Sequence, residues 1–265
     1  MKLGISYNVF DGEELLKASA ERMRLHADYI SVVYQLKSNS GRPALEGLID
    51  LLEDIRNAGI IDEIALYAPN LAITPALNEV QKRNIGLNLS RAHDCTHHLS
   101  MDTDEFYFTD QYANALFEIE MQGYDNTACQ MQTYYKRPEL RIVPPEDYWV
   151  TFVTKIHKHS EFKYNGYFPV LVDPTRRMNE GDIYCPARFH GFKRSELEMH
   201  HMSYVRKDLR RKLENSSANA NFISEIDQIV DHWENFEDGD QALFAGCPIV
   251  YHDLIEGSND FSINI

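Results

Sequence analysis

Four consecutive polar residues, Asp102-Thr103-Asp104-Glu105, follow directly on a segment with the composition of a β-strand. In an extended chain, side chains two residues apart share a face, so Asp102 and Asp104 can point together while Thr103 points away. Paired carboxylates offer the hard oxygen ligands that Mg²⁺ and Mn²⁺ prefer. The residues therefore predict a metal site for Mn²⁺ or Mg²⁺ at Asp102 and Asp104. A solvated acidic turn is the alternative.

The segment before these carboxylates predicts a helix followed by a strand. Apolar residues recur at helical spacing between 77 and 87, and Thr74 and Pro75 supply a capping hydroxyl and a first-turn proline. The apolar stretch at 98–101 then has the length of a strand. Two carboxylates at the carboxyl end of a strand lie where open α/β sheets bind ligands.

Strands and helices alternate through the first 125 residues. The pattern predicts strands at 3–9, 29–34, 64–67 and 98–101, with helices at 13–25, 45–55, 75–87 and 109–123 between and after them. This alternation is typical of a Rossmann-like α/β fold, in which a mostly parallel sheet is flanked by helices. From 136 to 192 the pattern becomes irregular and rich in proline, with strand-like runs at 150–156 and 168–172.

Composition limits the classes of partner. The chain has 265 residues and a formal net charge of −15, which argues against broad electrostatic binding to nucleic acid or to an anionic membrane. A phosphorylated ligand would therefore need a local basic cluster or a metal. Hydrophobic and charged fractions of 43% and 25% are ordinary for a globular domain.

Neither the cysteines nor the N-terminus indicates export. The four cysteines are widely spread without a CxxC pair, so they predict neither a zinc ribbon nor a disulfide framework. Met1 and Lys2 lead directly into an apolar strand, and no apolar run is long enough for a signal peptide or a membrane segment. We therefore expect a cytoplasmic location.

A second motif accompanies the acidic run. Lys82-Arg83-Asn84-Ile85-Gly86 lies about twenty residues before Asp102, after two strand–helix units. This arrangement resembles the RN-G and DxD motifs of family 2-like glycosyltransferases with the GT-A fold. The resemblance covers roughly residues 1–110, and less fully 198–213. It implies a GT-A fold and transfer of a sugar from a nucleotide-diphospho-sugar, with a UDP-sugar favoured, held through a metal at the DxD motif.

The loops after the first two strands open on the same crevice as Asp102 in such a sheet. Asn8, Tyr34 and Gln35 are therefore candidates for contacts to the nucleotide base and ribose. Local hydrogen bonds within the loops are the alternative for each of them.

Two residues of the KRNIG motif are also candidates for binding the nucleotide-sugar. The resemblance implies this role for Arg83 and Asn84, together with Asp102. Asn84 also lies on the apolar arc of its helix, where a buried amide requires a hydrogen-bond partner. A satisfied structural amide is the alternative for Asn84.

A late patch, Glu198–Lys207, contains two histidines beside a basic run. In the resembling enzymes a late histidine often supplies another metal ligand, and a nearby basic residue faces the diphosphate. Imidazole suits Mn²⁺ beside carboxylates, and guanidinium pairs bidentately with phosphate oxygens. We expect His201, or else His200, to bind the metal, and Arg206 or Lys207 to contact the diphosphate. A solvated helix face is the alternative for the basic run.

The resemblance also implies inversion at the anomeric carbon and hence a carboxylate base on the acceptor side. Asp173 fits this role because it ends the strand-like run at 168–172 and does not belong to the metal motif. A structural aspartate that caps the next turn or pairs with Arg176 is the alternative. Further candidates without a preceding strand are Glu180, Asp182 and Glu198.

We therefore expect one compact domain in three parts: a nucleotide-sugar half (1–125), an acceptor half with a metal- and diphosphate-binding helix (126–235), and a closing segment (236–265). The acceptor could be a glycan, a lipid, a protein or a modified base. One alternative is a metal-dependent phosphoesterase or nuclease, although no second Asp/His motif accompanies the DxD motif. The other is a non-catalytic nucleotide-sugar or glycan-binding domain, for which a broken DxD motif would be typical.

Overall fold

The computed structural model describes residues 1–164, 166–178, 187–216, 219–245 and 249–264. The strands are β1 (Leu3–Val9), β2 (Tyr29–Tyr34), β3 (Glu63–Leu66), β4 (His97–Asp102), β5 (Glu105–Phe106), β6 (Asn126–Tyr135), β7 (Leu140–Val143), β8 (Trp149–Lys155), β9 (Phe189–Phe192), β10 (Glu198–Tyr204), β11 (Ala242–Phe244) and β12 (Val250–Glu256). The helices are α1 (Glu13–Arg24), α2 (Leu48–Asn57), α3 (Pro75–Ala92), α4 (Thr109–Gln122), α5 (Leu209–Asn215) and α6 (Ile226–Glu234), with 3₁₀ turns η1 (Pro174–Arg176), η2 (Asn219–Asn221) and η3 (Ile223–Glu225).

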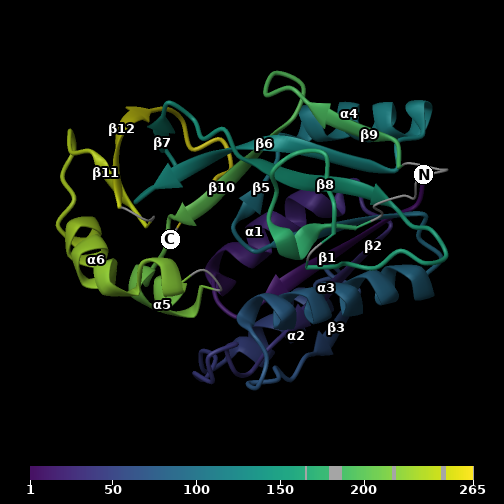
Figure 1. The fold of residues 1–265 in the computed structure, drawn as a ribbon, viewed down its shortest axis with the longest axis horizontal. Coiled ribbons are helices and arrows are strands. Elements are labelled where there is room, and N and C mark those ends of the chain that lie inside the picture. The colour runs from purple at the N-terminus through teal and green to yellow at the C-terminus, as the bar shows by residue number, and fades with distance from the viewer. Residues whose placement is uncertain (165, 179–186, 217–218, 246–248, 265) are drawn as a thin grey trace.

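The sheet has a parallel and a largely antiparallel part (Figure 1). Strands β3, β2, β1 and β4 lie side by side in this order, and each neighbouring pair is parallel. From β4 the sheet continues through β8, β6, β7, β12 and β11 in antiparallel pairs, while β9 and β10 run parallel to β6. The predicted α/β architecture, with helices flanking a mostly parallel central sheet, is confirmed.

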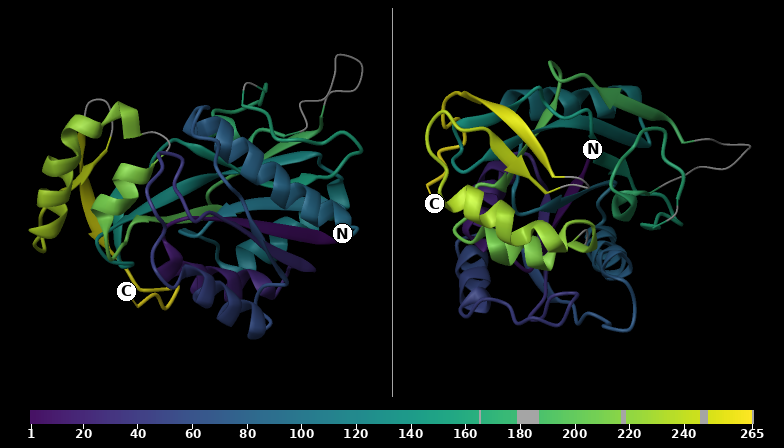
Figure 2. Two further views of the ribbon diagram at one scale, coloured as in Figure 1. Left: turned by 90° about the horizontal axis from the view of Figure 1, so that it is seen from below. Right: turned by 60° about the vertical axis from the view of Figure 1, so that its left-hand side comes forward.

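The helices cover both faces of the sheet (Figure 2). Helices α1, α2 and α4 contribute to one large apolar cluster with the inner strands. Helix α3 lies on the opposite face, where its apolar side packs with Phe162 and Met178 of the irregular segment. At the C-terminal end, α5, α6 and the β11–β12 hairpin enclose a cluster of their own.

Local sequence explains why the parallel part forms where it was predicted. All six residues of β2 are buried, as expected for a continuous apolar run at the centre of a parallel sheet. Helix α3 begins with Pro75, and the Thr74 side chain accepts a hydrogen bond from the Leu77 amide. Gly86 lets this helix approach β1 closely, because a Cβ there would collide with the Ser6 side chain.

The register between β1 and β4 places polar residues together at their carboxyl ends. Ser6 lies beside Ser100, and Asn8 lies beside Asp102. The backbone of Gln35, just after β2, donates a hydrogen bond to the Val9 carbonyl at 3.0 Å. The ends of β1, β2 and β4 therefore meet at one edge, as the topology of an open α/β sheet requires.

The later half differs from the expectation in three places. The run at 168–172 forms no strand and makes a single β-bridge, from Val172 to Trp149. Pro169 within the run and Pro174 after it lack the backbone N–H that a strand ladder needs. The histidine pair lies on strand β10, which the sequence pattern did not predict. Helix α5 begins only at Leu209, where the Asp208 side chain accepts from the Arg211 amide, so Arg206 and Lys207 precede it.

The closing segment at 236–265 contains strands β11 and β12, which extend the sheet through β7. Across the described parts of the chain, no helix has both the length and the apolar character needed to cross a membrane.

Candidate functional site

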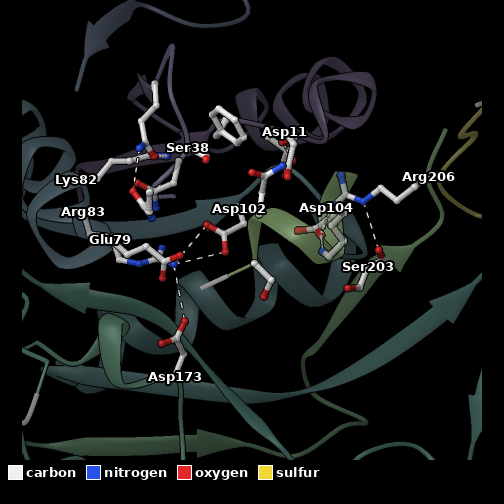
Figure 3. A pocket seen from close by; sticks show the side chains of 18 of the residues that line it. Asp11, Ser38, Glu79, Lys82, Arg83, Asp102, Asp104, Asp173, Ser203 and Arg206 are labelled. Atoms are coloured by element: carbon white, nitrogen blue, oxygen red, sulfur yellow. Dashed lines mark hydrogen bonds and ion pairs between the residues drawn. The ribbon is translucent and has the colours of Figure 1, made fainter. Parts of the chain in front are cut away.

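A polar cavity of about 300 Å³ lies at the carboxyl ends of β1, β2 and β4 (Figure 3). Its walls come from the loops after β1 and β2, one face of α3, the acidic run after β4, the turn before η1, and the segment from β10 to α5. Among the described residues, five carboxylates line it: Asp11, Glu79, Asp102, Asp104 and Asp173. Four cationic side chains from the same described ranges line it as well: Lys82, Arg83, Arg206 and Lys212. The predicted convergence of the acidic run with basic groups is therefore present.

Asp102 is held by two arginines. Arg176 Nη2 lies 2.6 Å from Asp102 Oδ2, and Arg83 Nη2 lies 3.4 Å from both carboxylate oxygens. Burial opposes the ionisation of Asp102, but the two guanidiniums outweigh it and hold its pKa below the usual range. Asp102 is therefore an ionised carboxylate near neutral pH.

Asp104 is held by a different set of cations. Arg206 Nη2 donates to Asp104 Oδ2, Lys212 Nζ lies 2.9 Å from the same oxygen, and His201 Nε2 lies 3.5 Å from it. Burial again opposes ionisation, but Lys212 and Arg206 hold the pKa of Asp104 well below its usual range. The two carboxylates of the motif therefore lie in one cavity but have separate partners.

Gly12 makes room for Arg206. Its backbone has φ of 72°, and a Cβ at this position would collide with Arg206 Nη1. Arg206 Nη1 is buried and has no hydrogen-bond partner among the described residues. A buried guanidinium nitrogen without a partner in a polar cavity suits an anionic ligand.

Three side chains that line the cavity are of types that bind divalent cations. Asp102, Asp104 and His201 line the same cavity, and carboxylate oxygen with imidazole nitrogen is a ligand type that Mn²⁺ accepts. A cation at Asp104 Oδ2 would compete with Lys212 and Arg206, since both contact this oxygen. Within the described ranges, no group of three or more His, Cys, Asp and Glu side chains is arranged to hold a metal ion.

Asn8, near the end of β1, and Gln35, just after β2, line the cavity, whereas Tyr34 does not. Asn8 Nδ2 lies 3.3 Å from Ser100 Oγ, and Asn8 Oδ1 is buried without a partner among the described residues. Gln35 Oε1 accepts from Lys82 Nζ at 2.7 Å. The Tyr34 side chain does not line the cavity and instead belongs to the main apolar cluster.

Lys82 and Glu79 are cavity residues that the sequence interpretation missed. Burial lowers the pKa of Lys82 to about 8 against the pull of the Asp102 and Glu79 carboxylates. Burial raises the pKa of Glu79 to about 7 despite the nearby Arg83. The helical spacing of Glu79, Lys82 and Arg83 along α3 could have indicated one shared face.

Of the two candidates in the KRNIG motif, only Arg83 lies at the cavity. Arg83 lines the cavity, and its Nη1 donates to Ser100 Oγ at 2.8 Å. Asn84 does not line it: its Nδ2 donates to the Phe162 carbonyl at 3.0 Å, and its Oδ1 accepts from the Phe162 amide at 2.8 Å. Asn84 is thus a satisfied structural amide that ties α3 to the irregular segment, which corrects the expected ligand contact.

Only one of the two histidines of the late patch faces the cavity, because neighbouring side chains of a strand point to opposite faces. His201 lines the cavity. His200 lies on the other face of β10, where its Nδ1 is 2.8 Å from the Tyr134 hydroxyl and its ring packs against Phe108 and Phe261. The structure therefore does not bring His200 to the carboxylates.

The basic candidates also separate. Arg206 lines the cavity, whereas Lys207 is exposed outside it, and its backbone amide donates to Glu14. Lys212 reaches the cavity from α5. The sequence interpretation did not assign Lys212 to the site.

Asp173 lines the cavity and also caps η1. Its Oδ1 accepts from the Thr175 amide and from Thr175 Oγ1, both at 2.8 Å. Its Oδ2 lies 3.7 Å from Arg176 Nε and 3.9 Å from Arg83 Nη2. The capping interpretation is therefore observed, and one oxygen remains directed towards the arginines.

The other candidate bases do not line the cavity. Glu198 lies on β10 and pairs with Arg194. Glu180 and Asp182 lie outside the described residues.

No protein-family model matches this chain, and no curated protein matches it. Among solved structures, S. aureus TarS 1–349 in complex with UDP is 14% identical, with a TM-score of 0.39, over 52% of this chain and 37% of that one. S. aureus TarS is 12% identical, with a TM-score of 0.47, over 89% of this chain and 43% of that one. Mannose-1-phosphate geranyltransferase from Thermus thermophilus is 15% identical, with a TM-score of 0.33, over 59% of this chain and 51% of that one. This chain thus spans less than half the length of the TarS chain. Likeness at this level leaves the interpretation of the site to its own residues.

Proposed function

We propose that this chain is a glycosyltransferase with a GT-A-like fold that transfers a sugar from a nucleotide-diphospho-sugar to an acceptor hydroxyl. The observation that carries this proposal is the convergence of Asp102 and Asp104 with Arg83, Arg206 and Lys212 in one cavity. Such a cavity, at the carboxyl ends of parallel strands, is suited to a ligand that carries both a nucleoside and a diphosphate.

In this proposal the carboxyl ends of β1 and β2 hold the nucleoside. Asn8 Oδ1 has no hydrogen-bond partner among the described residues, and the buried Lys82–Gln35 pair adds polar groups to the same cavity. Hydrogen-bonding groups of this kind suit the polar edge of a base or the hydroxyls of a ribose. A uridine nucleotide is the donor that we favour.

Arg206 and Lys212 hold the diphosphate. Both cations now lie on Asp104 Oδ2, and Arg206 keeps one nitrogen without a partner among the described residues. Phosphate oxygens accept the same charge-assisted hydrogen bonds as a carboxylate, so the side chains can exchange one anion for the other. This exchange would neutralise the charge that develops on the leaving diphosphate.

Asp102, Asp104 and His201 would hold Mn²⁺ or Mg²⁺. When bound, such an ion supplies charge neutralisation and orientation for the leaving diphosphate. Release of Lys212 from Asp104 frees the carboxylate for this role and directs the ammonium towards the phosphates.

Asp173 is the proposed general base. Its carboxylate takes the proton of the acceptor hydroxyl as the hydroxyl oxygen bonds to the anomeric carbon. The bond from that carbon to the diphosphate oxygen breaks on the opposite face, so the nucleoside diphosphate leaves with the bonding electrons and the configuration inverts. Two anchors on Oδ1 fix the orientation of Asp173 during this step.

The acceptor class and the cytoplasmic location stay predictions. The acceptor could be a glycan, a lipid, a protein or a modified base, since no feature of the described cavity selects one of them.

A thermal-shift titration with UDP, GDP and ADP, each with and without Mn²⁺, tests this function. Ligand at a hundred times its Kd should add roughly 2.7 kcal/mol to the free energy of unfolding. We expect UDP with Mn²⁺ to give the largest rise in melting temperature. Asp104→Asn should lose this rise, and Asp253→Asn, a matched change outside the cavity, should keep it.

Two outcomes would contradict the proposal. One is the absence of stabilisation by every nucleoside diphosphate. The other is release of a sugar phosphate from a UDP-sugar, which would indicate a phosphoesterase instead of a transferase.

A further inference from the structure

A buried ion pair lies beneath the cavity and is not explained by ligand binding. Arg176, on η1, is 5% exposed, and Glu105, on β5, is 2% exposed. Arg176 Nη1 donates to Glu105 Oε2 at 3.1 Å, and Nη2 donates to Glu105 Oε1. The pair is therefore bidentate and joins two segments that are 71 residues apart in sequence.

The same guanidinium reaches both carboxylates to which the proposed function gives a role. Its Nη2 lies 2.6 Å from Asp102 Oδ2, and its Nε lies 3.7 Å from Asp173 Oδ2. Its Nη1 also points to the Ser100 carbonyl at 3.4 Å, at the end of β4. One planar group thus contacts the end of β4, the acidic run and the acceptor-side turn.

Stability alone does not account for this arrangement. Two buried charges cost desolvation, and an apolar pair of similar volume is often as stable as a buried ion pair. What an apolar pair lacks is direction, because guanidinium donors lie in one rigid plane. The specific property of Arg176 is therefore the relative geometry that it imposes on its partners.

We propose that Arg176 is a positioning residue that holds Asp173 and Asp102 in one fixed geometry across the cavity, with Glu105 as its buried anchor. This inference rests on the proposed function, since it gives the two carboxylates their roles in transfer. Arg176 itself touches neither the donor nor the acceptor in this proposal.

The sharpest test replaces the pair and not one partner. Arg176→Met alone leaves Glu105 unpaired and should lower the melting temperature. The double variant Arg176→Met/Glu105→Met should recover most of that loss, because both buried charges are gone. Arg177→Met is the matched control: Arg177 is adjacent, donates to the Gly166 carbonyl and does not line the cavity.

Two readouts separate positioning from stability in the double variant. Hydrogen exchange of the Thr175 and Arg176 amides, which bond to Asp173, should be about tenfold faster or more, since the turn loses its anchor. Release of UDP from UDP-N-acetylglucosamine should slow by about tenfold or more in kcat, with UDP affinity little changed. Arg177→Met should leave both quantities as in the unaltered protein.

A purely structural role predicts the opposite result. The proposal is overturned if the double variant keeps both its exchange protection and its kcat within about twofold. If the double variant does not fold, Arg176→Lys is the deciding variant, because lysine keeps the positive charge but lacks the planar set of guanidinium N–H donors. A kcat equal to that of the unaltered protein in Arg176→Lys would overturn the proposal. The exchange measurement needs no ligand, so it tests Arg176 even if the unaltered protein binds no UDP and the proposed function fails.

Discussion

The two carboxylates of the acidic run are two residues apart, yet their surroundings differ. Asp102 is held by Arg83 and Arg176, whose side chains are 2% and 5% exposed and which have further partners on β4 and β5. Asp104 is held by Arg206, whose side chain is 3% exposed, and by Lys212 and His201, which are 20% and 24% exposed. Buried, multiply bonded partners cannot leave easily, whereas partly exposed ones can.

This difference suggests a division of work within one cavity. The Asp102 side is preorganised, because both of its arginines are fixed by other hydrogen bonds on rigid elements. The Asp104 side is exchangeable, because Lys212 comes from a short helix and meets the carboxylate through a flexible stem. We therefore expect ligand and metal binding to depend on the Asp104 side, and the geometry of the reaction on the Asp102 side.

The largest effect should come from Asp104→Asn. An amide cannot replace a carboxylate as a metal ligand of equal charge, so sugar transfer should fall by about a hundredfold or more. The fold should persist, but the melting temperature should fall, since Arg206, whose side chain is 3% exposed, loses its carboxylate partner. Turnover of the UDP-sugar and circular dichroism on the same sample check this. Near-normal turnover of the variant would contradict the proposed role of Asp104 in metal and ligand binding. UDP binding by the unaltered protein that is equally tight with and without Mn²⁺ would contradict it as well.

Asp173→Asn tests the geometry on the other side of the comparison. Loss of a general base lowers the rate by about 10²–10⁴, and donor affinity should be kept because Asp173 belongs to the acceptor side. The amide oxygen can still accept from the Thr175 amide, so the η1 turn should survive. The pH–rate profile and a separate UDP titration check this. If turnover stays within a few-fold, Asp173 is only a cap of the turn.

The histidine pair offers a smaller and more local comparison. His201→Ala should weaken Mn²⁺-dependent UDP binding by about tenfold or more, a typical loss for a group that tunes a metal site. His200→Ala should leave that affinity unchanged and lower the melting temperature, since it removes a buried ring and its bond to Tyr134. Calorimetry on both variants checks this. Equal affinity in the two variants would remove His201 from the proposed metal site.

Much of the donor half could be predicted because its signals are local. The cap and proline of α3, the apolar run of β2 and the acidic run after β4 each depend on residues close in sequence. Strand alternation could also have shown that only one of His200 and His201 can face the cavity, but β10 itself was not recognised.

The partners of the acidic run could not be predicted in the same way. Arg176 meets Glu105 across 71 residues, and Lys212 meets Asp104 across 108. Such contacts depend on how the irregular segment and the C-terminal helices pack, for which periodicity carries no signal. For Asn84, the sequence pattern indicated that the amide needs a hydrogen-bond partner. It did not indicate that this partner is the Phe162 backbone.

The last effect that we predict concerns His200 as a neutral core residue, in contrast with His201. Burial lowers the pKa of His200 to about 3 from its ordinary value of 6.5, and Arg141 adds to the shift. Between these values the unfolded chain binds a proton that the folded protein does not, so the free energy of unfolding falls as the pH falls. One such group contributes a slope of about 1.4 kcal/mol per pH unit in that window, and none above it.

His200→Phe keeps the aromatic packing and removes this proton, so its stability should fall less steeply than that of the unaltered protein between about pH 6 and pH 4. Urea unfolding at several pH values measures both slopes, and the comparison cancels the contributions of Glu79, Glu105 and the other histidines. Equal slopes would mean that His200 takes up its proton within the folded protein and is not the sealed core residue described above.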